Sequence, residues 1–212
     1  MFRDRVEAGQ RLAKVLSAYK GKDTIVLAIP RGGVVVGYQV AQELDAPLDI
    51  IVPRKVGAPN NPELAIGAVT QDGSLMLDPR LVELLRVPEI YIEEEARRQV
   101  DEIRRRMARY RGEKASTNLG GKVVILVDDG IATGATMRAA IASIRRQKPA
   151  VLVVAVAVGP PREIENLKGE VDRVVCLMTP EPFYAIGQFY RDFSQTSDEE
   201  VINLLQRMER GN

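Results

Sequence analysis

Runs of consecutive apolar residues recur along the chain and alternate with segments of helical periodicity. The runs are continuous, which is typical of strands that are buried on both faces of a sheet. We expect strands over residues 24–30, 48–56, 123–127, 150–158 and 171–178. Strands that alternate with helices predict an α/β fold, with a mostly parallel, twisted sheet and helices on both of its faces.

Apolar residues spaced by three and four positions predict the helices. The helical segments are residues 4–19, about 34–44, 79 to about 112, a stretch that ends near 147, a short helix opened by Pro160 and Pro161, and a C-terminal helix. Ser197 and Glu200 match a capping box at the start of the last one. Residues 63–70 and 74–78 predict a hairpin with Asp72 and Gly73 in its turn.

The segment from 79 to about 112 predicts one long amphipathic helix. Its apolar stripe consists of Ile92, Ala96, Val100, Ile103, Met107 and Tyr110. Glutamates 93–95 lie in its early turns, and its later turns are rich in arginine from 104 to 111. This order complements the helix dipole and favours a solvated helix over a stripe that binds nucleic acid.

Composition and charge narrow the function classes. Lys+Arg 30 against Asp+Glu 29 gives a net charge of +1, so total charge does not indicate a nucleic-acid or membrane partner. The chain has no histidine, which excludes His-based catalytic triads and His-ligated zinc. Its one cysteine, Cys176, lies in a predicted strand and indicates a small core residue and a reducing compartment. No signal peptide or membrane-spanning run is visible, so we expect a cytoplasmic protein.

The segment after the strand at 123–127 carries the main chemical signal. A loop before a helix presents free backbone N–H groups to an anion. Gly130 and Gly134 allow close backbone approach, and Thr133 and Thr136 add hydroxyl donors. The loop lacks the lysine and spacing of a nucleotide-triphosphate loop and also the G-x-G-x-x-G of a dinucleotide site.

Asp128 and Asp129 stand side by side at the start of this loop. Carboxylates would repel a phosphate unless they served another part of the ligand. Ribose hydroxyls and a Mg²⁺ ion are two suitable partners, since both favour carboxylate oxygen. The alternative is an ordinary strand-to-helix turn with a solvated acidic pair.

The stretch "VVILVDDGIATGATM" (123–137) resembles the phosphoribosyl-diphosphate signature of the type I phosphoribosyltransferases. The resemblance extends over most of the chain. It implies one phosphoribosyltransferase-like α/β domain over residues 1–212, with a helical insertion at 79–118 and a small C-terminal hood with its helix at 180–212. It also implies that Asp128 and Asp129 contact the ribose and, through its hydroxyls or water, a Mg²⁺ ion. The loop that would hold the 5-phosphate consists of Gly130, Ile131, Ala132, Thr133, Gly134, Ala135 and Thr136.

The resemblance also implies a pyrophosphate site. "PRGG" after the first strand matches the pyrophosphate loop of the family, in which Arg31 offers bidentate donors and Gly32 and Gly33 allow close approach. Arg54 and Lys55 would add positive charge toward the leaving pyrophosphate. The following segment, 57–62, lies where the family carries a flexible lid; a surface hairpin with a polar tip is the alternative.

The segment "EPFYAIGQFYRDF" (181–193) resembles the base-binding side of the members that use purines. The base-binding candidates are Phe183, Tyr184 and Asp192, with Phe189 and Tyr190 beside them. Aromatic packing under the C-terminal helix is the alternative for at least half of these rings. Ala132 departs from the family, because members that use 6-oxopurines carry an acid there.

The resemblance therefore implies an enzyme that transfers ribose 5-phosphate from phosphoribosyl diphosphate to a nitrogenous base, with Mg²⁺ and release of pyrophosphate. Asp128, Asp129, Arg31 and Lys55 would be its catalytic residues. One alternative is a regulator that senses phosphoribosyl diphosphate and binds nucleic acid without catalysis; another is a binding module without a reaction. Members of the family are commonly dimers, so we expect a homodimer. We expect no membrane partner.

Overall fold

The computed structural model describes residues 1–70, 73–112 and 117–211 of the chain. At its centre is a five-stranded parallel sheet in the order β2-β1-β6-β7-β8. The strands are β1 (Thr24–Ala28), β2 (Leu48–Ile50), β6 (Val123–Asp128), β7 (Val151–Val158) and β8 (Arg173–Met178). All residues of β1 and nearly all of β7 are buried, which explains why their apolar runs are continuous.

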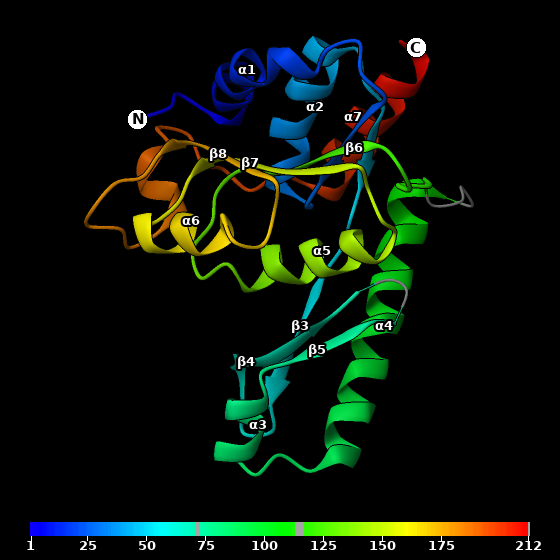
Figure 1. Ribbon diagram of the computed structural model, residues 1–212, viewed down its shortest axis with the longest axis vertical. Coiled ribbons are helices and arrows are strands. Elements are labelled where there is room, and N and C mark those ends of the chain that lie inside the picture. Colours follow the sequence, from blue (N-terminus) through cyan, green and yellow to red (C-terminus); the bar gives the residue numbers. More distant parts are fainter. Residues whose placement is uncertain (71–72, 113–116, 212) are drawn as a thin grey trace.

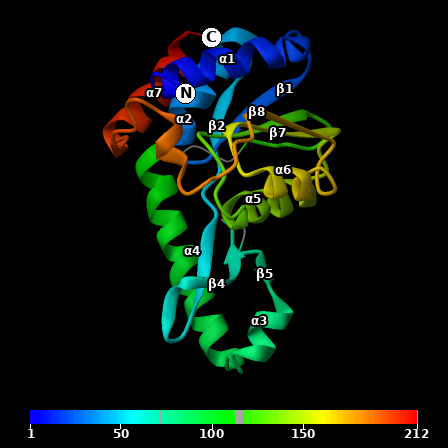
Figure 2. The ribbon, with the colours of Figure 1, turned by 90° about the vertical axis from the view of Figure 1, so that its left-hand side faces the viewer.

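Helices cover both faces of this sheet, as the sequence predicted (Figures 1 and 2). One face is covered by α1 (Arg5–Leu16), which continues in a short 3₁₀ helix (Ser17–Tyr19), by α2 (Gly32–Leu44) and by α7 (Asp198–Arg210). The other face is covered by α5 (Ala135–Arg146) and α6 (Pro161–Leu167). The mostly parallel α/β fold is therefore confirmed.

A second unit extends away from the parallel sheet. It contains the antiparallel strands β3 (Arg54–Ala58), β4 (Asn61–Val69) and β5 (Leu75–Leu77), and the helices α3 (Pro79–Leu84) and α4 (Glu89–Arg111). Figure 1 shows these elements, which we call the arm, below the parallel sheet. The expected pairing of β4 with β5 is confirmed, but Asp72 of its turn lies outside the described residues. Residues 113–116 of the expected helical insertion also lie outside them.

The expected single strand over residues 48–56 is wrong. β2 ends at Ile50 and pairs with β1, whereas β3 begins at Arg54 and pairs with β4 in the other sheet. Pro53 lies between them and has no backbone N–H for a sheet ladder, which ends the strand at the point where the chain leaves for the arm. Residues 57–62 then form the β3–β4 hairpin, with its turn at Pro59 and Asn60.

The expected continuous helix from 79 to about 112 is also wrong, because it is broken between Leu84 and Glu89. Pro88 is the N-cap of α4; it lacks the N–H that a helix interior needs, so α3 cannot run into α4. The apolar stripe is nevertheless correct for α4. Its residues Ile92, Ile103 and Tyr110 are buried in a core that α4 shares with β3, β4 and α7.

The hood lies between β8 and α7 and contains a short 3₁₀ helix (Ile186–Phe189). It packs on the N-terminal segment, where Phe2 forms a β-bridge with Tyr190 and their ring centroids lie 5.3 Å apart. The backbone N–H of Phe2 donates to the carbonyl of Phe189 at 2.8 Å. The N-terminal segment and the hood are therefore held next to each other beside β7.

Candidate active site

The loop between β6 and α5 surrounds a cavity of about 300 Å³ at the carboxyl end of the parallel sheet. Gly134, with a φ of 75°, is the N-cap residue of α5. Because glycine has no side chain to accept from them, the first N–H groups of that helix have no side-chain cap. Thr133 and Thr136 are exposed, so their hydroxyls are open to a ligand. All the predicted loop residues line this one cavity, together with Asp128 and four others: Ile29, Pro30, Met137 and Ile186.

The two adjacent aspartates face different surroundings. Asp128 lines the cavity, and its Oδ1 accepts from the N–H of Asp129 at 2.8 Å. Asp129 is not among the described residues that line this cavity. Its Oδ2 instead accepts from Arg5 Nε at 2.7 Å. The hydroxyl of Tyr190 donates to the carbonyl of Asp129 at 2.6 Å, which ties the acidic pair to the hood.

The pKa shifts of the two acids also have different causes. Burial raises the pKa of Asp128, and the neighbouring Asp129 carboxylate raises it further. Burial raises the pKa of Asp129 too, but the hydrogen bond and charge of Arg5 oppose this shift. Arg5 therefore favours the charged form of Asp129 directly, through a hydrogen bond to its carboxylate.

The "PRGG" turn packs directly on the acidic pair. The Pro30–Arg31 peptide is cis, and α2 begins at Gly32, two residues earlier than the sequence predicted. A Cβ atom on Gly33 would lie 2.9 Å from Asp128 Oδ1, so only glycine fits this approach. Pro30 lines the cavity, whereas the Arg31 guanidinium lies 3.8 Å from Asp198 Oδ1 of α7.

Arg54 and Lys55 lie away from the loop cavity. Both line a separate cavity of about 480 Å³ between the β3–β4 hairpin and α4. Arg54 Nε donates to Gln99 Oε1 at 2.9 Å, and burial and the charge of Arg106 lower the pKa of Arg54. The structure thus does not bring these two cations together with Asp128.

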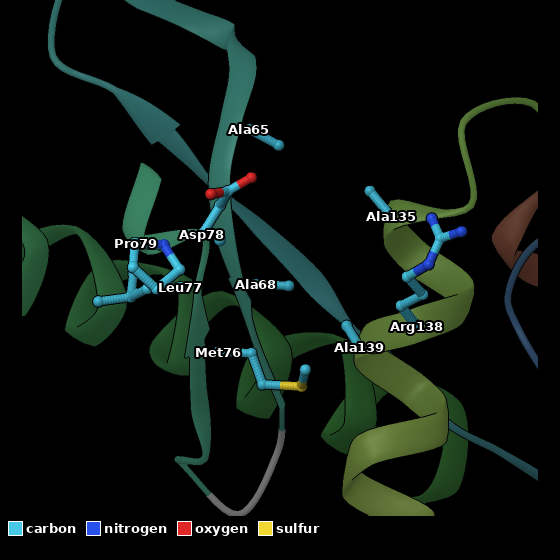
Figure 3. A pocket seen from close by; sticks show the side chains of 10 residues that line it. Ala65, Ala68, Met76, Leu77, Asp78, Pro79, Ala135, Arg138 and Ala139 are labelled. Atoms are coloured by element: carbon cyan, nitrogen blue, oxygen red, sulfur yellow. The ribbon is translucent and has the colours of Figure 1, made fainter. Parts of the chain in front are cut away.

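A third cavity, of about 420 Å³, separates the arm from α5. Figure 3 shows Ala135, Arg138 and Ala139 of α5 opposite Met76 and Asp78 of the arm. Ala135 lines both this cavity and the loop cavity. The inner side of the arm therefore lies next to the predicted phosphate loop, even though Arg54 and Lys55 do not.

The aromatic residues of the hood are mostly packed against one another. Phe183 stacks on Phe189 with ring centroids 5.3 Å apart, and Tyr190 is buried. Tyr184 is 83% exposed, and Asp192 Oδ1 accepts from the N–H of Ser194 at 2.9 Å. The described hood residue on the loop cavity is Ile186, which the sequence did not single out. Base binding by Phe183, Tyr184 or Asp192 stays a prediction.

Cys176 lies in β8 and is partly buried, in agreement with a packing role. Its Sγ donates to the carbonyl of Met178 at 3.1 Å, and burial raises its pKa to about 11. A thiol with such a pKa is a poor nucleophile near neutral pH.

Neither a ready-made metal cluster nor a membrane span is found among residues 1–70, 73–112 and 117–211. No group of three or more acids, cysteines or histidines there could enclose a metal ion. No helix in those ranges is long and apolar enough to cross a bilayer.

The sequence profile of the phosphoribosyl transferase domain matches residues 4–194, which include the loop, the acidic pair, the "PRGG" turn and the arm. The chain belongs to this family. The resemblance inferred from residues 123–137 is thereby confirmed.

The names of similar proteins agree with this assignment. A Mycobacterium tuberculosis protein named "Putative phosphoribosyl transferase Rv0571c" is 43% identical over 210 residues, which make up 99% of this chain and 47% of that protein. The chain thus spans about half the length of the curated relatives that it matches.

Solved structures share the fold. The crystal structure of TT1426 from Thermus thermophilus is 44% identical, with a TM-score of 0.85 and 98% of each chain covered, so the arm is part of the shared fold. A purine phosphoribosyltransferase from Pyrococcus horikoshii is 17% identical, with a TM-score of 0.50 over 91% of this chain and 93% of that one. At that identity the second likeness concerns the fold alone.

Proposed function

We propose that the chain transfers ribose 5-phosphate from phosphoribosyl diphosphate to a nitrogenous base and releases pyrophosphate. One observation carries this proposal: Asp128, the whole predicted phosphate loop and Pro30 of the "PRGG" turn line the same cavity. A phosphate cradle, an acid and a second glycine-rich turn are the parts that a ribose with phosphates at both ends requires.

The 5-phosphate would bind at the start of α5. There the backbone N–H groups after Gly134 and the exposed hydroxyls of Thr133 and Thr136 donate to an anion, and the helix dipole favours its charge. The ribose would lie over Asp128, whose carboxylate accepts from its hydroxyls. The pyrophosphate would then reach the "PRGG" turn, and Arg31 would donate to it after leaving its contact with Asp198.

The donor set is compatible with Mg²⁺. Mg²⁺ is commonly held by one or two carboxylates together with substrate phosphates and water, so a protein cage of three acids is not required. Asp128, with Asp129 beside it, would be the protein side of such a site. The ion would neutralise part of the negative charge of the pyrophosphate group.

The chemistry would rely on positioning and charge. The bond from the anomeric carbon to the pyrophosphate oxygen breaks, and its electron pair leaves with pyrophosphate. A nitrogen lone pair of the base forms the new bond, and the nitrogen releases its proton to water. Asp128 faces the positive charge that develops on the sugar, and the "PRGG" turn receives the departing anion.

The acceptor base would lie against apolar side chains of the cavity. Ala132 and Ile186 line it, and a Cβ atom on Gly130 would lie 2.6 Å from Ile186 Cγ2. Ala132 supplies no proton acceptor where members that use 6-oxopurines carry an acid. We therefore propose an acceptor that is recognised without an acidic side chain at this position.

The alternative of a regulator that binds nucleic acid has less support. The arginine-rich end of α4 is paired with acids: Arg105 and Arg106 with Glu102, and Arg109 with Asp198 and Glu199. Guanidinium groups that are paired with carboxylates attract a nucleic-acid phosphate backbone less strongly.

Pyrophosphate release tests the proposal. The protein is incubated with phosphoribosyl diphosphate, Mg²⁺ and a panel of purine, pyrimidine and pyridine bases. Release with at least one base, lost in Asp128→Asn and kept in Asp101→Asn on the exposed side of α4, is the expected result. Binding of phosphoribosyl diphosphate without release for any base would leave a binding module. A salt-dependent affinity for RNA or DNA that shifts with phosphoribosyl diphosphate would favour the regulator.

A further inference from the structure

Arg5 joins three parts of the molecule that are far apart in sequence. Its Nε donates to Asp129 Oδ2 at 2.7 Å, and its Nη1 donates to the carbonyl of Ser194 in the hood at 2.7 Å. Its guanidinium carbon lies 3.9 Å from the centre of the Phe193 ring. One side chain at the start of α1 therefore contacts both the acidic pair and the hood.

The contact with Asp129 is buried and sterically constrained. The side chains of Arg5 and Asp129 are 12% and 11% exposed. A Cβ atom on Gly32 would overlap with the Asp129 carboxylate and would lie 2.5 Å from Arg5 Nε. The ion pair thus rests directly on the first residue of α2, in the turn that we propose for pyrophosphate.

Arg5 compensates a buried negative charge beside the cavity. A buried carboxylate is costly unless it is paired and hydrogen-bonded. Arg5 supplies the opposing charge to Asp129, while Asp128 stays on the cavity side of the pair. Breaking a buried ion pair at one end leaves the other charge uncompensated.

We propose that Arg5 is a positioning residue for phosphoribosyl diphosphate. It holds the Asp129 carboxylate against Gly32, so that the acidic pair and the "PRGG" turn keep one relative position, with Asp128 directed at the ribose. Arg5 itself does not contact the substrate. This role rests on the proposed function, because it assumes that the cavity binds phosphoribosyl diphosphate.

Affinity for phosphoribosyl diphosphate tests this role, measured by calorimetry with Mg²⁺ at a temperature at which every variant is folded by circular dichroism. Arg5→Gln should weaken binding by about tenfold or more, because it removes a charge-assisted hydrogen bond at the acidic pair. Arg5→Lys keeps the charge and should recover most of the affinity. Arg11→Gln removes a guanidinium from the same helix, where it is exposed and paired with Glu7, and should leave affinity unchanged.

A double variant shows whether Arg5 acts through Asp129. If it does, Arg5→Gln combined with Asp129→Asn should bind no more weakly than Asp129→Asn alone, because the partner that Arg5 holds is already neutral. Losses that add would overturn the proposal, since they would mean that Arg5 acts on the ligand independently. Unchanged affinity in Arg5→Gln would also overturn it.

The outcomes separate this role from the proposed function. A wild-type protein that binds no phosphoribosyl diphosphate refutes the function on which both rest. If the wild type binds phosphoribosyl diphosphate and Arg5→Gln binds it equally well, only the positioning role is refuted. Loss in Arg5→Gln without recovery in Arg5→Lys would contradict a role through charge.

Discussion

Gly32 lies so close to Asp129 that a Cβ atom at position 32 would overlap with the Oδ2 atom of that carboxylate. Gly32 begins α2, and Asp129 follows the last residue of β6, so the two come from different βα connections. Their contact joins the turn proposed for pyrophosphate to the acids proposed for the ribose. Glycine is needed at position 32 because another segment approaches it closely, and not because of its backbone conformation.

Gly32→Ala tests this contact. The added methyl group must displace the Asp129 carboxylate or Arg5, so affinity for phosphoribosyl diphosphate should fall by about tenfold or more. Gly169→Ala is the matched control, because a Cβ atom there would meet only the carbonyl oxygen of Asn166, at 3.8 Å. Calorimetric titration of both variants makes the comparison. Wild-type affinity in Gly32→Ala would contradict the proposed coupling of the two segments.

Thr136→Val tests the phosphate loop. Thr136 is exposed in the first turn of α5 and lines the loop cavity, so its hydroxyl is free to donate to a phosphate. Loss of one hydrogen bond to a charged group should weaken binding of phosphoribosyl diphosphate by about tenfold, with little change in stability. Thr136→Ser keeps the hydroxyl and should bind nearly as the wild type does. Equal affinities for Val and Ser variants would exclude a role for this hydroxyl.

The loop could be predicted from the sequence because its signals are local. Asp128, Gly130, Gly134 and the threonines lie within nine residues, and a strand before them and a helix after them give their orientation. The role of Arg5 could not be predicted, since its partner Asp129 is 124 positions away and the pattern around Arg5 indicates only a helix.

The arm shows a second limit of sequence-based prediction. The apolar run over residues 48–56 contains strands of two different sheets, and apolar periodicity does not distinguish one buried strand from two short ones. Pro53 was the available signal for the break, as Pro88 was for the break between α3 and α4. The placement of Arg54 and Lys55 away from the loop cavity follows from the first of these breaks.

Arg111 anchors the base of the arm to the parallel sheet. It forms a buried ion pair with Asp49 of β2, and Thr117 Oγ1 donates to the same carboxylate at 2.7 Å. Arg111→Ala would leave the Asp49 charge without its cation, so we expect the free energy of unfolding to fall by about 3 kcal/mol. Arg104→Ala, on the exposed side of α4, should change it by less than about 0.5 kcal/mol. Urea denaturation measures both, and similar losses for the two variants would contradict the anchoring role.

Tyr110 should make stability depend on alkaline pH. Burial, followed by its hydrogen bond to Asp198 at 2.6 Å, raises the pKa of Tyr110 from 10.0 to about 12. Because the folded-state pKa is the higher one, the contribution of this phenol is fully present below pH 10 and is lost as the pH rises to about 12. The free energy of unfolding should therefore fall less steeply over this interval in Tyr110→Phe than in the wild type. Parallel curves for the two proteins would refute the shift.

The cavity at Asp128 should bind phosphoribosyl diphosphate. Calorimetric titration of the wild type, Asp128→Asn and the control Asp101→Asn, each with Mg²⁺, tests this binding. Wild type and control should bind equally, and Asp128→Asn should bind about a hundredfold more weakly, since it loses the charged acceptor for the ribose hydroxyls. Equal affinity in all three proteins, or no binding by the wild type, would show that this cavity is not the site for phosphoribosyl diphosphate.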